Sequence, residues 1–260
     1  MGQGGGDAVT LLAIDHLNCA FGNLVVTDDV SLSIDAGERH VVIGPNGAGK
    51  TSLINQIGGQ LKPNGGHIVF KGQDITGQAP GRISRLGVAR TFQRNNLFHN
   101  LSVIENLRLA LVVRFGNPLD VFRSAARDAA LIDRAHELMR RVHLDGDGNR
   151  AARNLSYGEQ RQLEIGIALA GEPERLLLDE PTSGMSPAET TRMIDLIAAL
   201  PRTLSVLMIE HDMNVVFSVA DRITVLYYGK ILATGTPAEI QDNARVREVY
   251  LGQVYLGAVH

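Results

Sequence analysis

The amino-acid sequence predicts an α/β fold with a mostly parallel sheet, an N-terminal antiparallel β subdomain and an inserted helical subdomain. Short aliphatic and β-branched runs recur along the chain and are followed by helix-like stretches, which is the alternation of α/β proteins. Residues 9–36 read as short strands separated by turns, which favours antiparallel pairing. Residues 95–153 have helical spacing without strand signals, so we interpret them as an insertion.

The composition is that of an ordinary soluble globular protein. The chain has 260 residues, 44% hydrophobic and 20% charged, and a net charge of −3, so it carries no global basic field that would attract nucleic acid. The single cysteine, Cys19, fits a reducing compartment. No apolar run approaches the ~18 residues of a membrane span. The first residues lack the basic and apolar regions of a signal peptide, and residues 1–8 are expected to be a flexible tail.

The elements follow in order around glycine and proline breaks. We assign residues 9–94 and 154–235 to the α/β core with its antiparallel subdomain, 95–153 to the helical subdomain and 236–260 to a C-terminal helical segment. In the helical subdomain, Ser102 and Glu105 form a capping box before a predicted helix over 102–113. The spacing of apolar residues between Phe122 and Val142 predicts a second helix. Expected strands lie at 9–14, 30–34, 40–43, 67–70, 176–178 and 204–209, helices at 51–57 and 187–200, and a hairpin at 221–235.

A phosphate-binding motif lies between the strand at 40–43 and the helix at 51–57. Its residues are Gly44-Pro45-Asn46-Gly47-Ala48-Gly49-Lys50-Thr51, which fit the pattern G-x-x-x-x-G-K-[ST] of a P-loop. Glycines allow backbone N–H groups to approach phosphate oxygens, and the helix N-terminus adds partial positive charge. Lys50 can reach the β- and γ-phosphates and the Thr51 hydroxyl can hold Mg²⁺. The α/β core is therefore predicted to be a P-loop NTPase core.

Further polar residues follow apolar, strand-like runs. They are Gln93 after Phe92, Asp179 and Glu180 after Leu178, and His211 after the strand that ends at Ile209. Because ligands of parallel sheets bind at the carboxyl ends of the strands, we expect these groups to meet around one phosphate tail. Asp179 can hold the magnesium shell and Glu180 can orient or deprotonate the attacking water. His211 is predicted to contact the γ-phosphate side.

Ser156 and Glu159 allow two interpretations. Their S-x-x-E spacing is that of a helix capping box, and the sequence alone favours that structural role. A capped helix start with exposed N–H groups at Gly158 is also an anion site. Since the P-loop already supplies one helix terminus to this phosphate, a second anion site makes sense if it faces a nucleotide on another copy of the chain.

Together these motifs resemble the ATP-binding subunit of an ABC transporter. Gly44–Thr51, Gln93, Leu155–Gln160, Leu176–Glu180 and His211 stand in the family's order of Walker A, Q-loop, signature, Walker B and H-loop. Finer features resemble the branched-chain amino acid importer subfamily: Leu155 to Ile165, Glu210 to Met213, Gly235 to Pro237 and Tyr250 to Gly252. Phe21 is an even choice between a core aromatic and a ligand contact from the sequence alone. The resemblance favours adenine stacking, because Phe21 falls at the family's adenine-stacking position.

The resemblance implies an ATPase that binds ATP and Mg²⁺ and closes as a head-to-tail dimer on two nucleotides. The second ATPase subunit would be a copy of this chain or a homologue. Each site would join residues of one copy to Ser156, Gly158 and Gln160 of the other. The implied partners are transmembrane permease subunits and, indirectly, a periplasmic or extracellular solute-binding protein, with no nucleic acid. The implied location is the cytoplasmic face of the inner (plasma) membrane. The nucleotide contacts are expected to be Phe21, Gly44, Pro45, Asn46, Gly47, Ala48, Gly49, Lys50, Thr51, Ser52, Gln93, Ser156, Gly158 and Gln160; the catalytic residues Lys50, Glu180 and His211; and the metal ligands Thr51, Gln93 and Asp179.

Two alternatives remain beside the importer. An exporter subunit for lipid or lipopolysaccharide would use the same site chemistry. A soluble ABC protein acting on DNA or ribosomes usually carries a coiled-coil insertion or two ATPase halves, which the sequence does not indicate. Ser186 stands where the family has its D-loop aspartate, and Arg175 borders the Walker B strand where an apolar residue is usual. We have no sequence-based account of Arg175.

Overall fold

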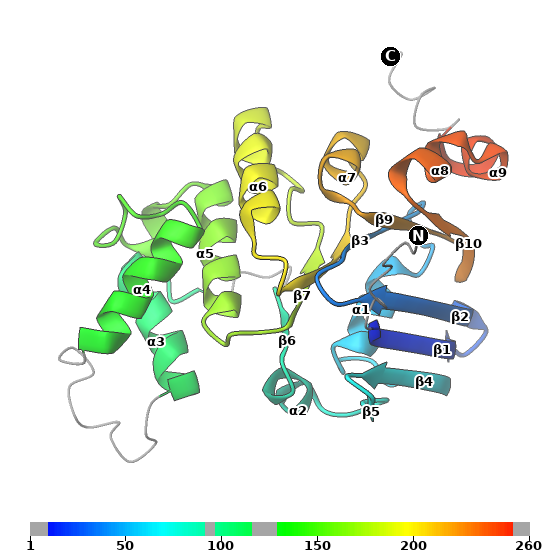
Figure 1. Ribbon diagram of the computed structural model, residues 1–260, viewed down its shortest axis with the longest axis horizontal. Coiled ribbons are helices and arrows are strands. Elements are labelled where there is room, and N and C mark those ends of the chain that lie inside the picture. Colours follow the sequence, from blue (N-terminus) through cyan, green and yellow to red (C-terminus); the bar gives the residue numbers. More distant parts are fainter. Residues whose placement is uncertain (1–9, 92–96, 116–128, 252–260) are drawn as a thin grey trace, which may run out of the picture. The chain divides into compact units, whose positions relative to one another are not determined.

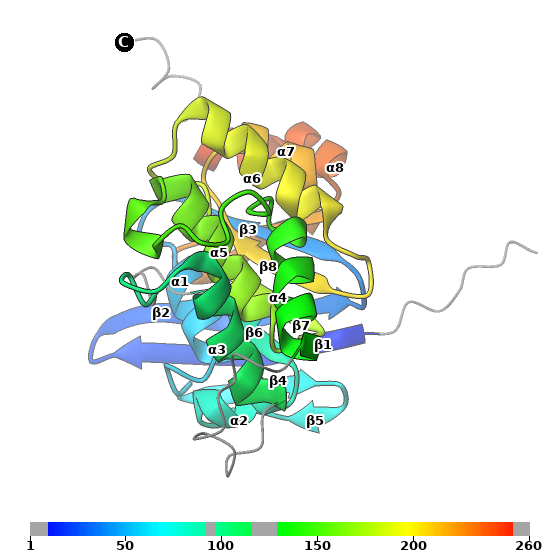
Figure 2. The same cartoon turned by 90° about the vertical axis from the view of Figure 1, so that its left-hand side faces the viewer.

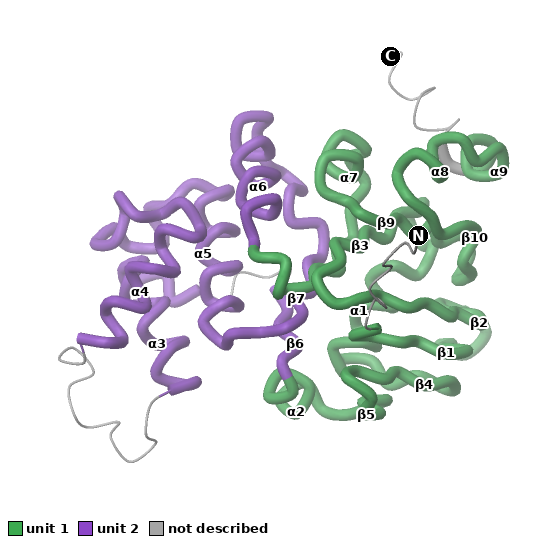
Figure 3. The backbone as a smooth tube through the Cα atoms, in the orientation of Figure 1, with its two compact units in different colours: residues 1–86, 201–260 green, residues 87–200 purple. Residues whose placement is uncertain are grey.

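The computed structural model describes residues 10–91, 97–115 and 129–251 and divides into two compact units. Unit 1 comprises residues 1–86 and 201–260, and unit 2 comprises residues 87–200 (Figure 3). The boundaries between the two units, after residues 86 and 200, fall within the α/β core that the sequence predicts. The predicted domain boundaries, among them those of the helical subdomain at 95–153, stay a prediction.

Unit 1 contains an antiparallel sheet with strand order β2-β1-β4-β5. Its long strands lie side by side (Figure 1), and apolar residues that face each other across them are buried, as the pairs Ile14–Leu32 and Ile14–Ile68 show. The first two strands are longer than predicted and form a hairpin that reaches Phe21 and Leu24. The strands are β1 (Thr10–Phe21), β2 (Leu24–Asp35), β4 (Gly65–Phe70) and β5 (Gln73–Asp74).

A second group of strands in unit 1 has the order β10-β9-β3-β8. Strand β3 is parallel to both β8 and β9, and β10 closes the edge as the predicted antiparallel hairpin. All residues of β3 and β8 are buried, which explains their nearly continuous apolar sequences. The strands are β3 (Arg39–Ile43), β8 (Ser205–Ile209), β9 (Arg222–Tyr227) and β10 (Lys230–Gly235).

The helices of unit 1 are short. Helix α1 follows β3 at the predicted place and buries Leu53, Ile54 and Ile57. Near the C-terminus, α8 and α9 contact β10. The helices are α1 (Lys50–Ile57), α2 (Pro80–Arg85), α7 (Met213–Val219), α8 (Pro237–Asp242), α9 (Ala244–Val246) and the π-helix η4 (Arg247–Leu251).

In the described part of unit 2, two parallel strands are combined with four α-helices. Strand β6 (Val88–Arg90) pairs with β7 (Arg175–Asp179). Helix α3 packs against α4 and α5, and α3 and α4 run beside each other in both views (Figure 1, Figure 2). The Ser102–Glu105 capping box is present at the start of α3. The helices are α3 (Val103–Phe115), α4 (Ala129–Arg141), α5 (Tyr157–Leu169), α6 (Pro187–Ala199) and the 3-10 helix η3 (Ala152–Asn154).

The α/β fold class is confirmed, with parallel strands, an antiparallel sheet and helices. The predicted helix between Phe122 and Val142 is observed from Ala129 to Arg141, and its first part lies outside the described residues. Arg175 is fully buried at the start of β7. Among the described residues, no helix is both long and apolar enough to cross a membrane.

Candidate functional site

The loop between β3 and α1 has the backbone that the phosphate-binding motif requires. Gly44 and Gly49 have φ angles of 152° and 101°. A Cβ on Gly44 would lie 2.2 Å from the Leu226 carbonyl oxygen, and one on Gly49 would lie 2.0 Å from the Val26 carbonyl oxygen. A side chain at either position would therefore clash with backbone, and the loop can pass so close to its neighbours only as glycine.

Lys50 is held inside this loop at the first position of α1. Its side chain is buried, and Nζ donates hydrogen bonds to the carbonyl oxygens of Gly44 (2.7 Å) and Pro45 (3.1 Å). The ammonium group is therefore placed at the N-terminus of α1, where an anion is already favoured by the unpaired N–H groups of the first helical turn. Thr51 is exposed at the next position, and Ser52 is half-buried.

A hairpin turn supports the loop from a distant part of the sequence. Gly229, between β9 and β10, donates its N–H to the Ala48 carbonyl oxygen (3.0 Å). Its own carbonyl oxygen accepts the N–H of Asp28 (2.8 Å). The turn thus joins the phosphate-binding loop to β2. Sequence reasoning found the turn but missed this contact, because no local pattern records which backbone group a glycine meets.

His211 lies at the same edge of the sheet as the loop. The register pairs Val42 of β3 with Ile209 of β8 in parallel, so Gly44 and His211 both stand two residues beyond a paired position. Glu210, which is fully buried, accepts the His211 backbone N–H through Oε2 (3.0 Å). The His211 side chain is 56% exposed. It is therefore open to a ligand at this edge.

Phe21 is not a core residue. It ends β1 at the turn of the first hairpin and is 56% exposed, and its cross-strand partner Leu24 is 65% exposed. The interpretation as a core aromatic is wrong because the two strands continue past the buried part of the sheet. An exposed ring on a rigid hairpin is available for stacking on a planar ligand.

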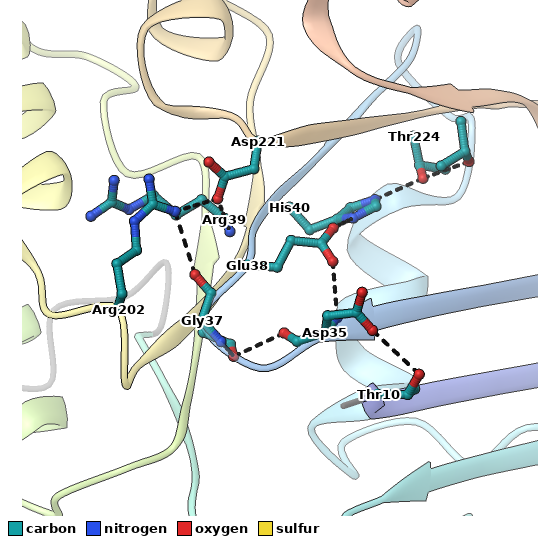
Figure 4. Close-up of polar contacts among 11 residues, drawn as sticks. Thr10, Asp35, Gly37, Glu38, Arg39, His40, Arg202, Asp221 and Thr224 are labelled. Carbon is teal, nitrogen blue, oxygen red and sulfur yellow. Dashed lines mark hydrogen bonds and ion pairs between the residues drawn. The ribbon is translucent and has the colours of Figure 1, made fainter. Parts of the chain in front are cut away.

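At the start of β3, before the loop, lies a buried network of hydrogen-bonded side chains that sequence reasoning missed. His40 is fully buried between Glu38 and Thr224 (Figure 4). Its Nδ1 lies 2.6 Å from Glu38 Oε1 and its Nε2 lies 2.7 Å from Thr224 Oγ1. Because a carboxylate only accepts, Nδ1 carries the proton. The other carboxylate oxygen accepts the Asp35 N–H (2.9 Å).

This hydrogen-bond network keeps Glu38 charged inside the protein. Burial alone would raise the pKa of the carboxyl group. The hydrogen bonds from His40 and the Asp35 N–H, together with the nearby charge of Arg222, outweigh burial and lower the pKa below its ordinary 4.5. The network thereby fixes β3 to β9 a few residues before the phosphate-binding loop.

In unit 2, Asp179 and Glu180 lie at the end of β7 as predicted. Asp179 is buried, and its Oδ2 lies 3.4 Å from Nη2 of Arg90, which ends the neighbouring strand β6. Glu180 is half-buried and has a positive φ of 48°. Such a conformation is uncommon for a residue with a side chain. Gln93 lies outside the described residues.

The start of α5 contains the predicted capping box. Ser156 Oγ accepts the Glu159 N–H (3.3 Å), and Glu159 Oε2 accepts the Ser156 N–H (2.6 Å). Glu159 also forms an ion pair with Arg150. Gln160 donates from Nε2 to the Leu155 carbonyl oxygen (3.1 Å). The structural interpretation of Ser156 and Glu159 is therefore confirmed.

A second carboxylate reaches this helix start, and sequence reasoning missed it. Glu189 of α6 accepts hydrogen bonds through Oε1 from Ser156 Oγ (2.8 Å) and from the Gly158 N–H (3.0 Å). The first turn of α5 thus holds an anion, as an anion site would. The S-x-x-E spacing of Ser186 and Glu189 predicts a capping box on α6, but it does not reveal contact with another helix.

The predicted site residues are divided between the two units. Phe21, the phosphate-binding loop and His211 belong to unit 1, and Asp179, Glu180, Ser156, Gly158 and Gln160 belong to unit 2. Within unit 1 the loop and His211 share one sheet edge. That the groups of both units meet around one nucleotide stays a prediction.

Family models match two parts of the chain. The ABC transporter model matches residues 27–183, and a model of the branched-chain amino acid ATP-binding cassette transporter matches residues 230–255. The first match spans more than half of the chain and includes every predicted motif from the phosphate-binding loop to Glu180.

Similar proteins and structures cover nearly the whole chain. The high-affinity branched-chain amino acid transport ATP-binding protein LivG of Escherichia coli is 41% identical, over 94% of this chain and 98% of its own. Its counterpart BraF of Pseudomonas aeruginosa is 39% identical with the same coverage. A crystal structure of an ATP-binding cassette of an ABC transporter in its ADP conformation is 29% identical. It covers 94% of this chain and 99% of its own, with a TM-score of 0.83.

Proposed function

The chain belongs to the ABC transporter family, as one of its ATP-hydrolysing subunits, and from this premise we propose that it powers the uptake of branched-chain amino acids. The observation that carries the proposal is its similarity, over 94% of the chain, to ATP-binding proteins named for that transport. The match of residues 230–255 to a model of the same class supports an importer over a lipid or lipopolysaccharide exporter.

ATP is proposed to be the ligand of the loop between β3 and α1. Lys50 would exchange its bonds to the Gly44 and Pro45 carbonyl oxygens for phosphate oxygens, which are stronger acceptors for an ammonium group. Backbone N–H groups at the α1 N-terminus would bind the same phosphates. Phe21 would stack on the adenine, and His211 would contact the γ-phosphate.

Magnesium is proposed to bind together with ATP. The Thr51 hydroxyl is exposed at the start of α1, and Asp179 supplies a carboxylate at the end of β7, which are the oxygen ligands that Mg²⁺ prefers. Gln93 is proposed as the third protein ligand. The ion would neutralise charge on the β- and γ-phosphates, while Glu180 orients or deprotonates the attacking water.

The working form is proposed to be a head-to-tail pair of ATPase subunits. The nucleotide bound by the second subunit would face Ser156, Gly158 and Gln160 of the first. Such an arrangement uses each surface twice in a closed two-fold assembly. Permease subunits would hold the pair at the cytoplasmic face of the membrane. A solute-binding protein would act through those permeases.

Purification of the tagged chain from the membranes of cells that produce it tests the proposal that it belongs to an importer. We expect permease subunits to co-purify. In proteoliposomes, the ATPase rate should rise several-fold when a solute-binding protein loaded with leucine, isoleucine or valine is added. The same binding protein without amino acid is the control. ATPase activity that responds instead to lipid or lipopolysaccharide would favour the exporter and contradict the proposal.

A further inference from the structure

One carboxylate in unit 2 accepts hydrogen bonds from the first turns of two helices. Oε1 of Glu189 accepts from Ser156 Oγ and the Gly158 N–H at the start of α5. Oε2 accepts from the backbone N–H (3.0 Å) and Oγ (2.8 Å) of Ser186 at the start of α6. Four donors and the positive ends of two helix dipoles therefore converge on this single negative charge.

The contact with α5 goes beyond the capping of α6. A capping box needs one oxygen of its glutamate on the N-cap N–H, and Oε2 of Glu189 satisfies that need. The capping box of α8 is a direct comparison, because Glu239 Oε2 likewise accepts the Thr236 N–H (2.7 Å). In Glu189, the other carboxylate oxygen additionally accepts hydrogen bonds from Ser156 and Gly158.

Glu189 covers the donors of α5 closely. Gly158 is buried, and a Cβ added to it would lie 2.9 Å from both Cγ and Oε1 of Glu189. Its N–H belongs to the first helical turn, where backbone N–H groups have no carbonyl partner within the helix. The backbone N–H and hydroxyl of Ser186 and the hydroxyl of Ser156 lower the pKa of the Glu189 carboxyl to about 2. The group is ionised at every physiological pH.

We propose that Glu189 is an internal competitor for the phosphate that a second subunit's ATP presents to Ser156 and Gly158. The inference rests on the proposed function and concerns the regulation of that site. The two donors bind the Glu189 carboxylate in the single subunit. Closure of the pair requires the terminal phosphate of ATP, which carries more negative charge than one carboxylate, to replace Oε1.

The competition has a direct consequence for the nucleotide requirement. A nucleotide without a γ-phosphate leaves Oε1 of Glu189 in place. The carboxylate then repels the phosphates of the nucleotide bound to the approaching subunit. Glu189 therefore favours the separated subunits until ATP is bound. Removing its charge should lower the ATP concentration needed for closure.

Light scattering during size-exclusion chromatography measures this directly. The full chain carrying Glu180→Gln, which slows hydrolysis and keeps ATP bound, is compared with the same chain carrying Glu189→Gln as well. Glutamine retains the capping box on α6, but it removes the charge from Ser156 and Gly158. We expect the ATP concentration at half-dimerisation to fall about tenfold, with unchanged ATP affinity at low protein concentration. Glu239→Gln in the same background is the matched control and should cause no shift.

The outcomes separate the inference from the proposed function. A dimer that forms at the same or a higher ATP concentration in the Glu189→Gln chain overturns the inference alone. If ATP binds but neither chain dimerises, there is no phosphate contact to compete for and the inference is again overturned, while hydrolysis by the unmodified chain keeps the proposed function standing. Absence of ATP binding in both chains contradicts the proposed function itself.

Amide hydrogen exchange at Gly158 tests the contact without a dimer. In the nucleotide-free chain, we expect the Gly158 N–H to exchange at least about tenfold more slowly than in the Glu189→Ala chain, because Glu189 covers it. The Thr190 N–H, which bonds the Ser186 carbonyl oxygen in α6, reports whether α6 stays folded in the variant. Equal exchange at Gly158 in both chains, with α6 intact, would show that Glu189 does not hold this donor.

Discussion

At the scale of single residues, the loop lysine carries the clearest prediction. Lys50→Ala removes the ammonium group that the Gly44 and Pro45 carbonyl oxygens hold at the start of α1. Because the phosphate charge loses its partner, we expect the ATPase rate to fall at least about 100-fold. A phosphate-release assay measures it, with Lys71→Ala on the distant β4–β5 turn as the control. Activity like that of the unmodified chain would contradict the site assignment.

Glu180 should separate ATP binding from hydrolysis. Glu180→Gln preserves the size and hydrogen-bonding shape of the side chain but removes its ability to take a proton from water. Loss of a general base typically costs 10²–10⁴-fold in rate, so we expect turnover to fall by about that factor while ATP affinity stays within about twofold. Equilibrium binding of a fluorescent ATP analogue and single-turnover hydrolysis provide the two readouts. Full turnover in the variant would exclude Glu180 from this role.

Glu38 predicts a dependence of stability on pH. Its folded pKa lies below the ordinary 4.5, so its contribution is fully present above that value and is lost as the pH falls through the folded pKa. Glu38→Gln should cost about 1–3 kcal/mol at pH 7, since a buried charge-assisted hydrogen bond is lost. Urea unfolding should show the stability gap between the two chains narrowing as the pH falls below about 4.5. As a control, Glu105→Gln at an exposed capping position should lower the free energy of unfolding by under about 0.5 kcal/mol. A stability gap for Glu38→Gln that does not change with pH would refute the argument.

At the scale of elements, the β9–β10 hairpin should act on the phosphate-binding loop. Gly229 has a φ of 78°, and a Cβ there would lie 3.3 Å from the Val26 carbonyl oxygen. Gly229→Ala therefore adds crowding against the Val26 carbonyl group to the backbone strain of about 1–2 kcal/mol. Both effects disturb the turn whose N–H holds the Ala48 carbonyl oxygen. We expect ATP affinity to fall about tenfold, measured by calorimetry.

Gly72 offers a matched control for this hairpin variant. It has a φ of 75° in the β4–β5 turn, and a Cβ would meet no atom within 4 Å. Gly72→Ala should lose similar stability through the same strain but keep its ATP affinity. Equal ATP affinity in both variants would show that the contact between Gly229 and Ala48 does not position the loop.

Elements governed by local sequence could be predicted, and contacts between distant elements could not. The phosphate-binding loop, the capping boxes of α3 and α5 and the β9–β10 turn each depend on residues within a few positions. The contacts of Gly229 with Ala48 and of Glu189 with Gly158 join elements far apart in the chain. The exposure of Phe21 escaped prediction for a related reason, because it depends on where the paired strands leave the buried sheet.

At the scale of the whole molecule, the motif order identified the family, while the substrate is beyond the reach of this sequence. An ATPase subunit uses the same loop, carboxylates and histidine whatever its transporter carries. The choice of branched-chain amino acids therefore comes from similarity to named relatives, and contacts with the transported molecule are expected in other chains. Gln93 lies outside the described residues, so its role stays a prediction from motif order.

The charge of the whole chain predicts its behaviour towards nucleic acid. With a net charge of −3, the chain offers few phosphate contacts, and binding driven by counterion release should be absent. We expect no change in the fluorescence anisotropy of labelled DNA or RNA at micromolar protein in 50 mM salt, with or without ATP. A genuine binder with 6–10 phosphate contacts would show affinity there and lose about 10³–10⁵-fold of it by 200 mM. Such a salt-dependent affinity would favour the soluble ABC alternative over a transporter, because a permease-bound ATPase has no use for it.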